Sequence, residues 1–125
     1  IFEVIVRGEK SDANEVSVTL MTSSQIKKIN AKFRDVDAPT DILSFPDGEF
    51  RQAGDLLLCP SYIKTKAKEY GHTIRQHYAL LCIHGMLHLL GYDHKRDVDY
   101  KKMKHKEDYY FKKLQGYLSV SKLNY

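Results

Sequence analysis

The chain has 125 residues, of which 42% are hydrophobic and 29% charged, a balance that is ordinary for a soluble globular protein. Its formal net charge of +4 permits a polyanionic partner such as nucleic acid but does not require one. No apolar run approaches the ~20 residues of a membrane-spanning helix and no signal-peptide pattern is present, so we expect a cytoplasmic protein without a membrane partner.

The hydrophobic pattern predicts a single domain over residues 1–125, with no linker or internal repeat. The sequence starts with Ile1 and not with methionine, which leaves room for a preceding N-terminal segment. The β-branched residues of segment 1–7 favour a strand. Alternation over 15–21 predicts a strand with Val16, Val18 and Leu20 on one face. Further strands are expected at 41–45 and 54–59, and helices at 25–33, 61–70, 73–90 and 97–118.

The last expected helix combines an apolar stripe with many lysines. The predicted buried face consists of Tyr100, Met103, Tyr110, Phe111, Leu114 and Leu118. The lysines are either a solvated surface or, if they flank a cleft, a positive charge that follows an RNA backbone.

The most informative stretch is residues 84–94, which read HGMLHLLGYDH. His84 and His88 are four residues apart, so a helix places both imidazoles on one face, one turn apart. Gly91 can adopt the left-handed conformation that ends a helix, and we expect the following turn to bring His94 back toward the pair. Three neutral imidazoles with a fourth position left for water make an open zinc site. The pattern predicts one Zn²⁺ per chain, bound by His84, His88 and His94.

Several neighbouring groups have two interpretations from sequence alone. Asp93 either orients a metal-binding imidazole or closes the turn, and Asp55 is either an outer partner of the site or a capping carboxylate. His77 is best interpreted as structural, and His72 and His105 as surface residues.

The string from His84 to His94 resembles the H-G-x-L-H-L-x-G-Y-D-H signature of the YbeY family of metal-dependent endoribonucleases. Residues 30–46 resemble that family's second signature, N-x-x-[YF]-R-x-x-D-x-P-T-D-[VIL]-L-S-F-P. Gly54 and Asp55 also match the G-D-[IV] motif that opens the family's inner strand, where this chain has Leu56 at the [IV] position. The resemblance implies an α+β fold, with a small mixed β-sheet surrounded by helices and a zincin-like metal helix lining a cleft. It favours a helix for 1–7, against the local propensity. It also gives Arg34 a catalytic role, because a guanidinium can grip a phosphate with two hydrogen bonds.

The same resemblance implies a zinc-dependent hydrolase that cuts single-stranded RNA. Its expected partners are ribosomal RNA and the small ribosomal subunit, with roles in maturing the 3′ end of the small-subunit RNA and in ribosome quality control. The zinc string is also similar to the H-E-x-x-H-x-x-G-x-x-H helix of metzincin proteases, but Gly85 replaces the glutamate that acts there as general base.

Two alternatives stay open at this point. One is another metallohydrolase such as a peptidase, which would lack its usual base. The other is a non-catalytic ribosome assembly factor with a structural metal.

Overall fold

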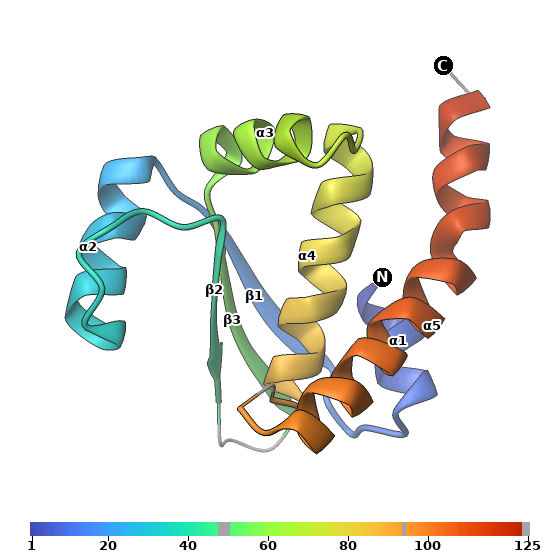
Figure 1. The fold of residues 1–125 in the computed structure, drawn as a ribbon. Coiled ribbons are helices and arrows are strands. Elements are labelled where there is room, and N and C mark those ends of the chain that lie inside the picture. Colours follow the sequence, from blue (N-terminus) through green and yellow to red (C-terminus); the bar gives the residue numbers. More distant parts are fainter. Residues whose placement is uncertain (48–50, 94, 124–125) are drawn as a thin grey trace.

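The computed structural model describes residues 1–47, 51–93 and 95–123, with side chains described as far as residue 115. The elements follow one another along the chain in the order α1 (Phe2–Gly8), β1 (Glu15–Leu20), α2 (Ser23–Arg34), β2 (Ile42–Pro46), β3 (Gln52–Leu58), α3 (Pro60–Glu69), α4 (Ile74–Leu89) and α5 (Asp97–Leu123). This arrangement confirms the α+β prediction (Figure 1).

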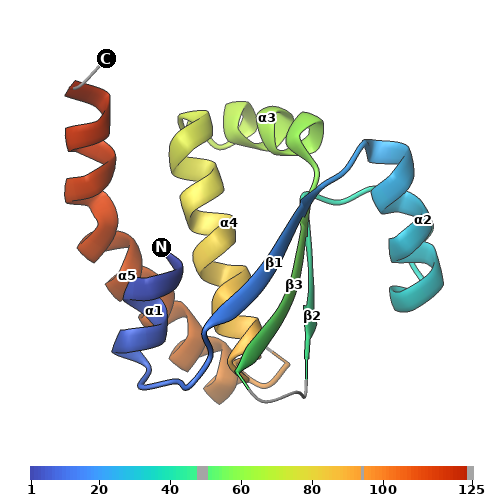
Figure 2. The ribbon, with the colours of Figure 1, turned by 180° about the vertical axis from the view of Figure 1, so that it is seen from behind.

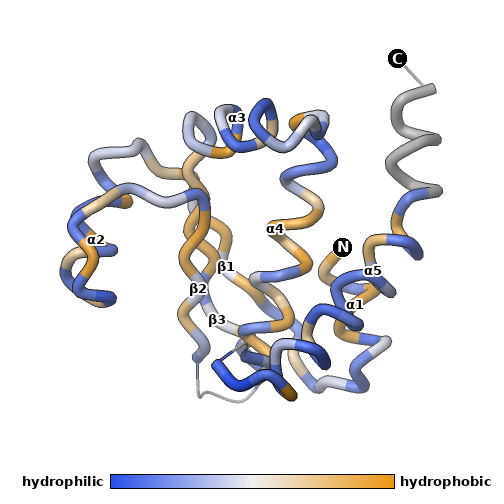
Figure 3. Tube along the Cα trace, viewed as in Figure 1, coloured by the Kyte–Doolittle hydropathy of each residue, from blue (hydrophilic) through white to orange (hydrophobic). Residues whose placement is uncertain are grey.

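The sheet is small and mixed, with strand order β1-β3-β2. β3 pairs in parallel with β1 and antiparallel with β2. Because β3 is the central strand, its Leu56, Leu57 and Leu58 are all buried, with at most 9% of their surface exposed. This confirms the prediction, made from the unbroken apolar run, of a strand buried on both faces. The apolar strands and α4 form the hydrophobic centre of the molecule (Figure 3).

α4 lies between the sheet and the outer helices α1 and α5, as Figures 1 and 2 show from opposite sides. It begins with a capping box, in which the Thr73 side chain accepts from the Gln76 backbone and the Gln76 side chain accepts from the Thr73 backbone. Its Ile83, Met86 and Leu87 belong to the main core. A helix packed on both sides is a rigid support for the residues of the histidine motif.

Close packing of α4 on the sheet depends on Gly85. A Cβ atom at this position would lie 2.8 Å from Leu56 Cδ2 and 2.9 Å from Ile42 Cδ1, closer than such atoms approach in proteins. Position 85 therefore faces β2 and β3, and a side chain there would require the Leu56 and Ile42 side chains to shift.

The structure confirms a helix for the first segment and corrects one predicted core position, Tyr100. Residues 2–8 form a helix, as the family resemblance implied, because Ile5 is wholly buried in the core and this packing outweighs β propensity. β1 is an edge strand, and its Val18 and Leu20 are 54% and 62% exposed, whereas Val16 packs against the main core. Tyr100 is 55% exposed, since α5 joins the core only from Met103 onward; Leu118 lies outside the described side chains.

Among the helices that the structure describes, none is long and apolar enough to cross a membrane.

Candidate functional site

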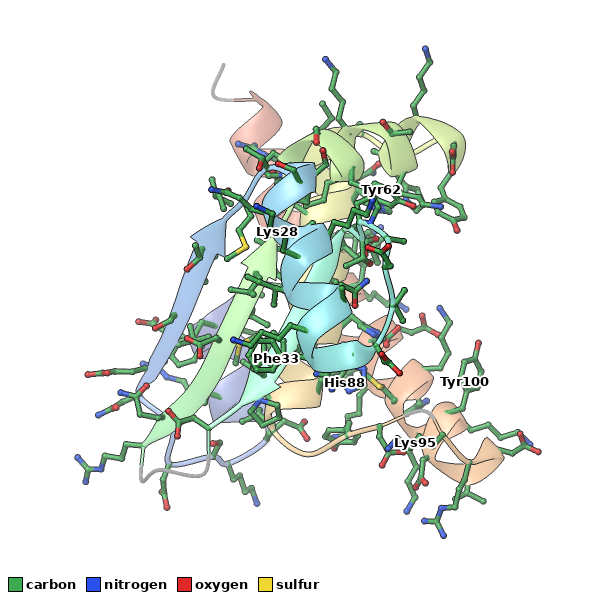
Figure 4. All side chains as sticks on the ribbon, turned by 90° about the vertical axis from the view of Figure 1, so that its left-hand side faces the viewer. Lys28, Phe33, Tyr62, His88, Lys95 and Tyr100 are labelled. Atoms are coloured by element: carbon green, nitrogen blue, oxygen red, sulfur yellow. The ribbon has the colours of Figure 1, made fainter. Side chains whose placement is uncertain are left out.

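Three of the predicted site residues, Arg34, His84 and His88, line a hollow of about 570 Å³ between the end of α2, strand β2 and the end of α4. Its lining includes Arg34, Ser44, His84, His88 and Lys95. His88, Lys95 and Tyr100 are seen together on one side of the molecule in Figure 4. Two basic side chains and two imidazoles make this hollow suitable for an anionic ligand.

α4 places His84 and His88 on one face, with ring centroids 4.6 Å apart and ring planes 81° from parallel. The helix then ends in a Schellman turn, in which the Gly91 N–H donates to the His88 carbonyl at 3.1 Å and the Tyr92 N–H donates to the Leu87 carbonyl at 3.0 Å. Gly91 has φ +105°, a conformation that side chains rarely allow. The turn expected at Gly91 is thus confirmed.

Each imidazole of the pair is held through its Nδ1 atom. His88 Nδ1 lies 2.9 Å from the Tyr92 carbonyl oxygen, and His84 Nδ1 lies 2.6 Å from Glu107 Oε1. Both oxygens are hydrogen-bond acceptors, so Nδ1 is the donor nitrogen of each ring. This arrangement, with one nitrogen fixed by a carbonyl or carboxylate, is typical of imidazoles that bind a metal through the other nitrogen.

The third predicted ligand, His94, lies outside the described residues. Within 1–47, 51–93 and 95–123, no group of three histidine, cysteine or acidic side chains is placed to hold a metal ion. The pair of imidazoles fits the donor set of a zinc site, and the complete triad stays a prediction.

Arg34 reaches the same hollow from the end of α2. Its Nη2 donates to the Ser44 carbonyl at 2.7 Å, and its guanidinium lies 4.9 Å from the centroid of the Phe45 ring. Asp35 ends the helix in a left-handed conformation, and the buried Asn30 donates through Nδ2 to the Ala38 carbonyl at 2.9 Å, which holds the returning loop. Residues far apart in the sequence thus bring a fixed cation beside the histidine pair.

The carboxylates near the motif have different surroundings, and one that contacts a site imidazole was not predicted. Asp93 Oδ1 accepts from the Lys95 N–H at 3.2 Å, as expected for closing the turn. Asp55 is exposed on β3, next to Leu56, whose side chain faces α4. Glu107 on α5 is the acidic residue that contacts a site imidazole, and sequence reasoning missed it. In the sequence, Glu107 could have been noticed as a charged residue on the same helical face as Met103 and Tyr110, which are buried.

His77 is structural, as predicted, but His72 is not an isolated surface residue. The two Nδ1 atoms lie 3.3 Å apart, and His77 is only 5% exposed. Burial lowers the pKa of His77, although Asp41, with Oδ2 4.0 Å from His77 Nε2, acts in the opposite direction. This cluster lies at the start of α4, at the opposite end of the helix from His88.

Comparison with known proteins gives a consistent result. The profile of the family described as "Endoribonuclease YbeY" matches residues 1–115. A protein of that name from Sulfurihydrogenibium sp. is 42% identical over 106 residues, covering 80% of this chain and 70% of its own length. Another from Persephonella marina is 40% identical over 124 residues, covering 94% of this chain and 81% of its own. The solution structure of TM1509 from Thermotoga maritima superposes with a TM-score of 0.70 at 35% identity, covering 95% of this chain and 79% of that one.

Proposed function

This chain belongs to the endoribonuclease YbeY family, and from that membership and the geometry of the hollow we propose that it is a zinc-dependent endoribonuclease. The observation that carries the proposal is the convergence of Arg34, His84 and His88 on one hollow, with both imidazoles held through Nδ1. His84, His88 and His94 would hold the ion. Bound there, Zn²⁺ supplies Lewis acidity toward the phosphate and lowers the pKa of a water molecule to about 7.

The chain's own contribution to phosphodiester cleavage is chiefly to hold and neutralise the phosphate. The Arg34 guanidinium is fixed by the Ser44 carbonyl and the Phe45 ring, so it presents its other N–H groups with little loss of conformational freedom. A cation fixed before the substrate arrives stabilises negative charge that develops on the phosphate oxygens. Lys95, which lines the same hollow, adds positive charge along the RNA backbone.

The packing of Gly85 argues against a peptidase of the metzincin type. Such an enzyme needs a glutamate at this position of the helix, where this chain has Gly85 packed against the ends of the Leu56 and Ile42 side chains. Without that glutamate, this position lacks the general base that peptide hydrolysis of the metzincin type requires.

The substrate we propose is single-stranded ribosomal RNA, near the 3′ end of the small-subunit RNA, with a further role in ribosome quality control. The signatures at 30–46 and 84–94 and the net charge of +4 support this choice. A ribosomal substrate would place the protein in the cytoplasm and bring it into contact with the small ribosomal subunit.

The test is cleavage of an end-labelled single-stranded RNA by zinc-loaded protein. We expect cutting to be lost with a chelator or in His88→Ala, and to fall by about 100-fold or more in Arg34→Ala, because removal of one such charge-stabilising donor typically costs ~10²–10³ in rate. His105→Ala and Arg7→Ala, which change exposed residues of the same types elsewhere, should cut like wild type.

Two results would count against this function. Cutting that survives His88→Ala would remove the metal from the reaction and indicate a contaminating nuclease. Zinc-loaded protein that binds RNA or ribosomal subunits without cutting would favour an assembly factor with a structural metal.

A further inference from the structure

A second, smaller hollow of about 240 Å³ lies on the α5 side of His84. Its lining consists of His84, Tyr100, Met103, Lys104 and Glu107. Since His84 also lines the larger hollow, the two hollows meet at this imidazole. A nucleotide that follows one bound in the larger hollow is therefore near the smaller hollow.

The smaller hollow combines an aromatic ring, an apolar floor and a cation. Tyr100 is 55% exposed, although it lies in the apolar stripe of α5, whereas Met103, which lines the same hollow, is 1% exposed. An exposed aromatic ring offers a face on which any nucleobase can stack. Glu107 is already engaged by the His84 ring, so it belongs to the wall between the two hollows.

Lys104 can supply charge to a ligand in this hollow. Its Nζ lies 3.4 Å from Asp108 Oδ1 in an i,i+4 pair whose side chains are 57% and 68% exposed. An exposed pair of this kind is weak, so the ammonium can exchange the carboxylate for a phosphate at little cost. A ring for stacking and a lysine for the backbone are the elements with which proteins bind single-stranded nucleic acid.

The size of the hollow favours a single base. Pockets for drug-sized ligands enclose roughly 300–1,000 Å³, so about 240 Å³ suits one flat ring system and not a longer segment. The proximity of the hollow to His84 places that ring close to the phosphate held beside Arg34.

We propose that this hollow is a nucleobase subsite, in which the base of a nucleotide flanking the scissile phosphate stacks on Tyr100 while Lys104 contacts the RNA backbone. The proposal rests on the proposed endoribonuclease function and deepens it. It assigns a substrate-binding role to α5, which contributes neither the arginine nor the histidine pair.

The experiment compares Tyr100→Ala, Tyr100→Phe and Tyr109→Ala on a short single-stranded RNA with one mapped cleavage site. Tyr109 is a matched control, because it is 51% exposed on the same helix and packs on Tyr110 and Lys113. We expect Tyr100→Ala to weaken RNA binding and raise KM by about 5-fold or more, the loss of one base–aromatic stack, with kcat changed much less. Tyr100→Phe keeps the ring and should behave like wild type, as should Tyr109→Ala.

A set of RNAs, each with one abasic nucleotide near the cleavage site, identifies the stacked base. At one position the abasic RNA should bind wild type as weakly as intact RNA binds Tyr100→Ala, and the two changes together should cost no more than either alone. Additive losses at every abasic position would overturn the subsite, as would unchanged binding by Tyr100→Ala.

Binding is measured by fluorescence anisotropy alongside cutting, so the two proposals fail separately. If wild type cuts RNA normally and Tyr100→Ala changes neither binding nor KM, the base subsite is wrong and the nuclease proposal stands. Wild type that binds RNA without cutting sinks the nuclease proposal, while the abasic series still decides whether a base stacks on Tyr100.

Discussion

The proposed role of Glu107 rests on one contact, its hydrogen bond with the His84 imidazole. Its Oε1 lies 2.6 Å from His84 Nδ1, and its side chain is 21% exposed. A carboxylate in this position fixes the imidazole tautomer and orients the ring. The adjacent Asp108 offers a natural comparison, because it is an acidic residue of the same helix that points to solvent and pairs with Lys104.

We predict that Glu107→Ala weakens zinc binding by about 10- to 100-fold, the usual effect of removing an outer partner of a metal-binding histidine. Asp108→Ala, the matched control, should leave the affinity unchanged. Competition with a chromophoric chelator measures both affinities without reference to RNA cleavage. Equal affinities in Glu107→Ala and wild type would show that His84 does not depend on this carboxylate for metal binding.

Elements that carry their own local signals were predictable from the sequence. α4 was expected at 73–90 and runs over Ile74–Leu89, because Thr73 caps it and Gly91 ends it by local chemistry. The spacing of His84 and His88 was equally local. α1 was different, since its β-branched residues favour a strand and only the burial of Ile5 against the rest of the core decides for a helix.

The parts of the site that could not be predicted depend on contacts between distant elements. The Glu107 carboxylate meets His84 across 23 positions of sequence, and no rule of spacing connects them. Tyr100 is exposed because α5 joins the core only from Met103 onward, and the apolar pattern of this helix does not show where that contact begins. Arg34 was identified through the family signature, because by local pattern alone it is an ordinary cation at a helix end.

A second contact between elements supports the turn that follows α4. Glu9, just after α1, has a side chain that is 10% exposed and accepts hydrogen bonds from the Tyr92 hydroxyl at 2.5 Å, from the Tyr110 hydroxyl, and from Lys106 Nζ at 3.1 Å. The Tyr92 carbonyl is also the acceptor for His88 Nδ1. Glu9 is thereby joined to the histidine pair through one residue.

We predict that Tyr92→Phe and Tyr110→Phe have similar effects on stability but different effects on the metal site. Each variant removes one hydroxyl from Glu9, and each should lower the free energy of unfolding by about 1–3 kcal/mol in urea titrations. Tyr92→Phe should also weaken zinc binding by a few-fold, because the carbonyl that orients His88 is less firmly held. Equal zinc affinities in the two variants would contradict this coupling.

At the scale of the whole molecule, buried ionisable groups near both ends of α4 make the fold sensitive to acid. Burial alone would raise the pKa of Glu9, but hydrogen bonds from Tyr110, Tyr92 and Lys106 outweigh it and lower the pKa below the ordinary 4.5. At the start of α4, burial lowers the pKa of His77 below the ordinary 6.5. Both groups therefore bind protons more readily in the unfolded chain than in the folded one.

The direction of the pH dependence follows from this difference. When the folded pKa is depressed, the stabilisation is present above the unfolded pKa and is lost as the pH falls through the folded value. The free energy of unfolding should therefore decrease below about pH 6.5 through His77 and decrease again below about pH 4.5 through Glu9. Glu9→Gln should remove the lower step while lowering stability at neutral pH.

Urea titrations from pH 7 to pH 3 test this expectation, with a chelator present so that loss of metal does not contribute. Glu3→Gln is the matched control, because Glu3 is an exposed glutamate in α1 and its replacement should leave the acid limb as in wild type. In wild type, the loss of stability due to Glu9 should come below pH 4.5, where Glu9 takes up its proton and its hydrogen bonds with Tyr92, Tyr110 and Lys106 are weakened. If Glu9→Gln loses as much free energy of unfolding below pH 4.5 as wild type does, other carboxylates govern unfolding in acid and Glu9 does not link α1 to α5.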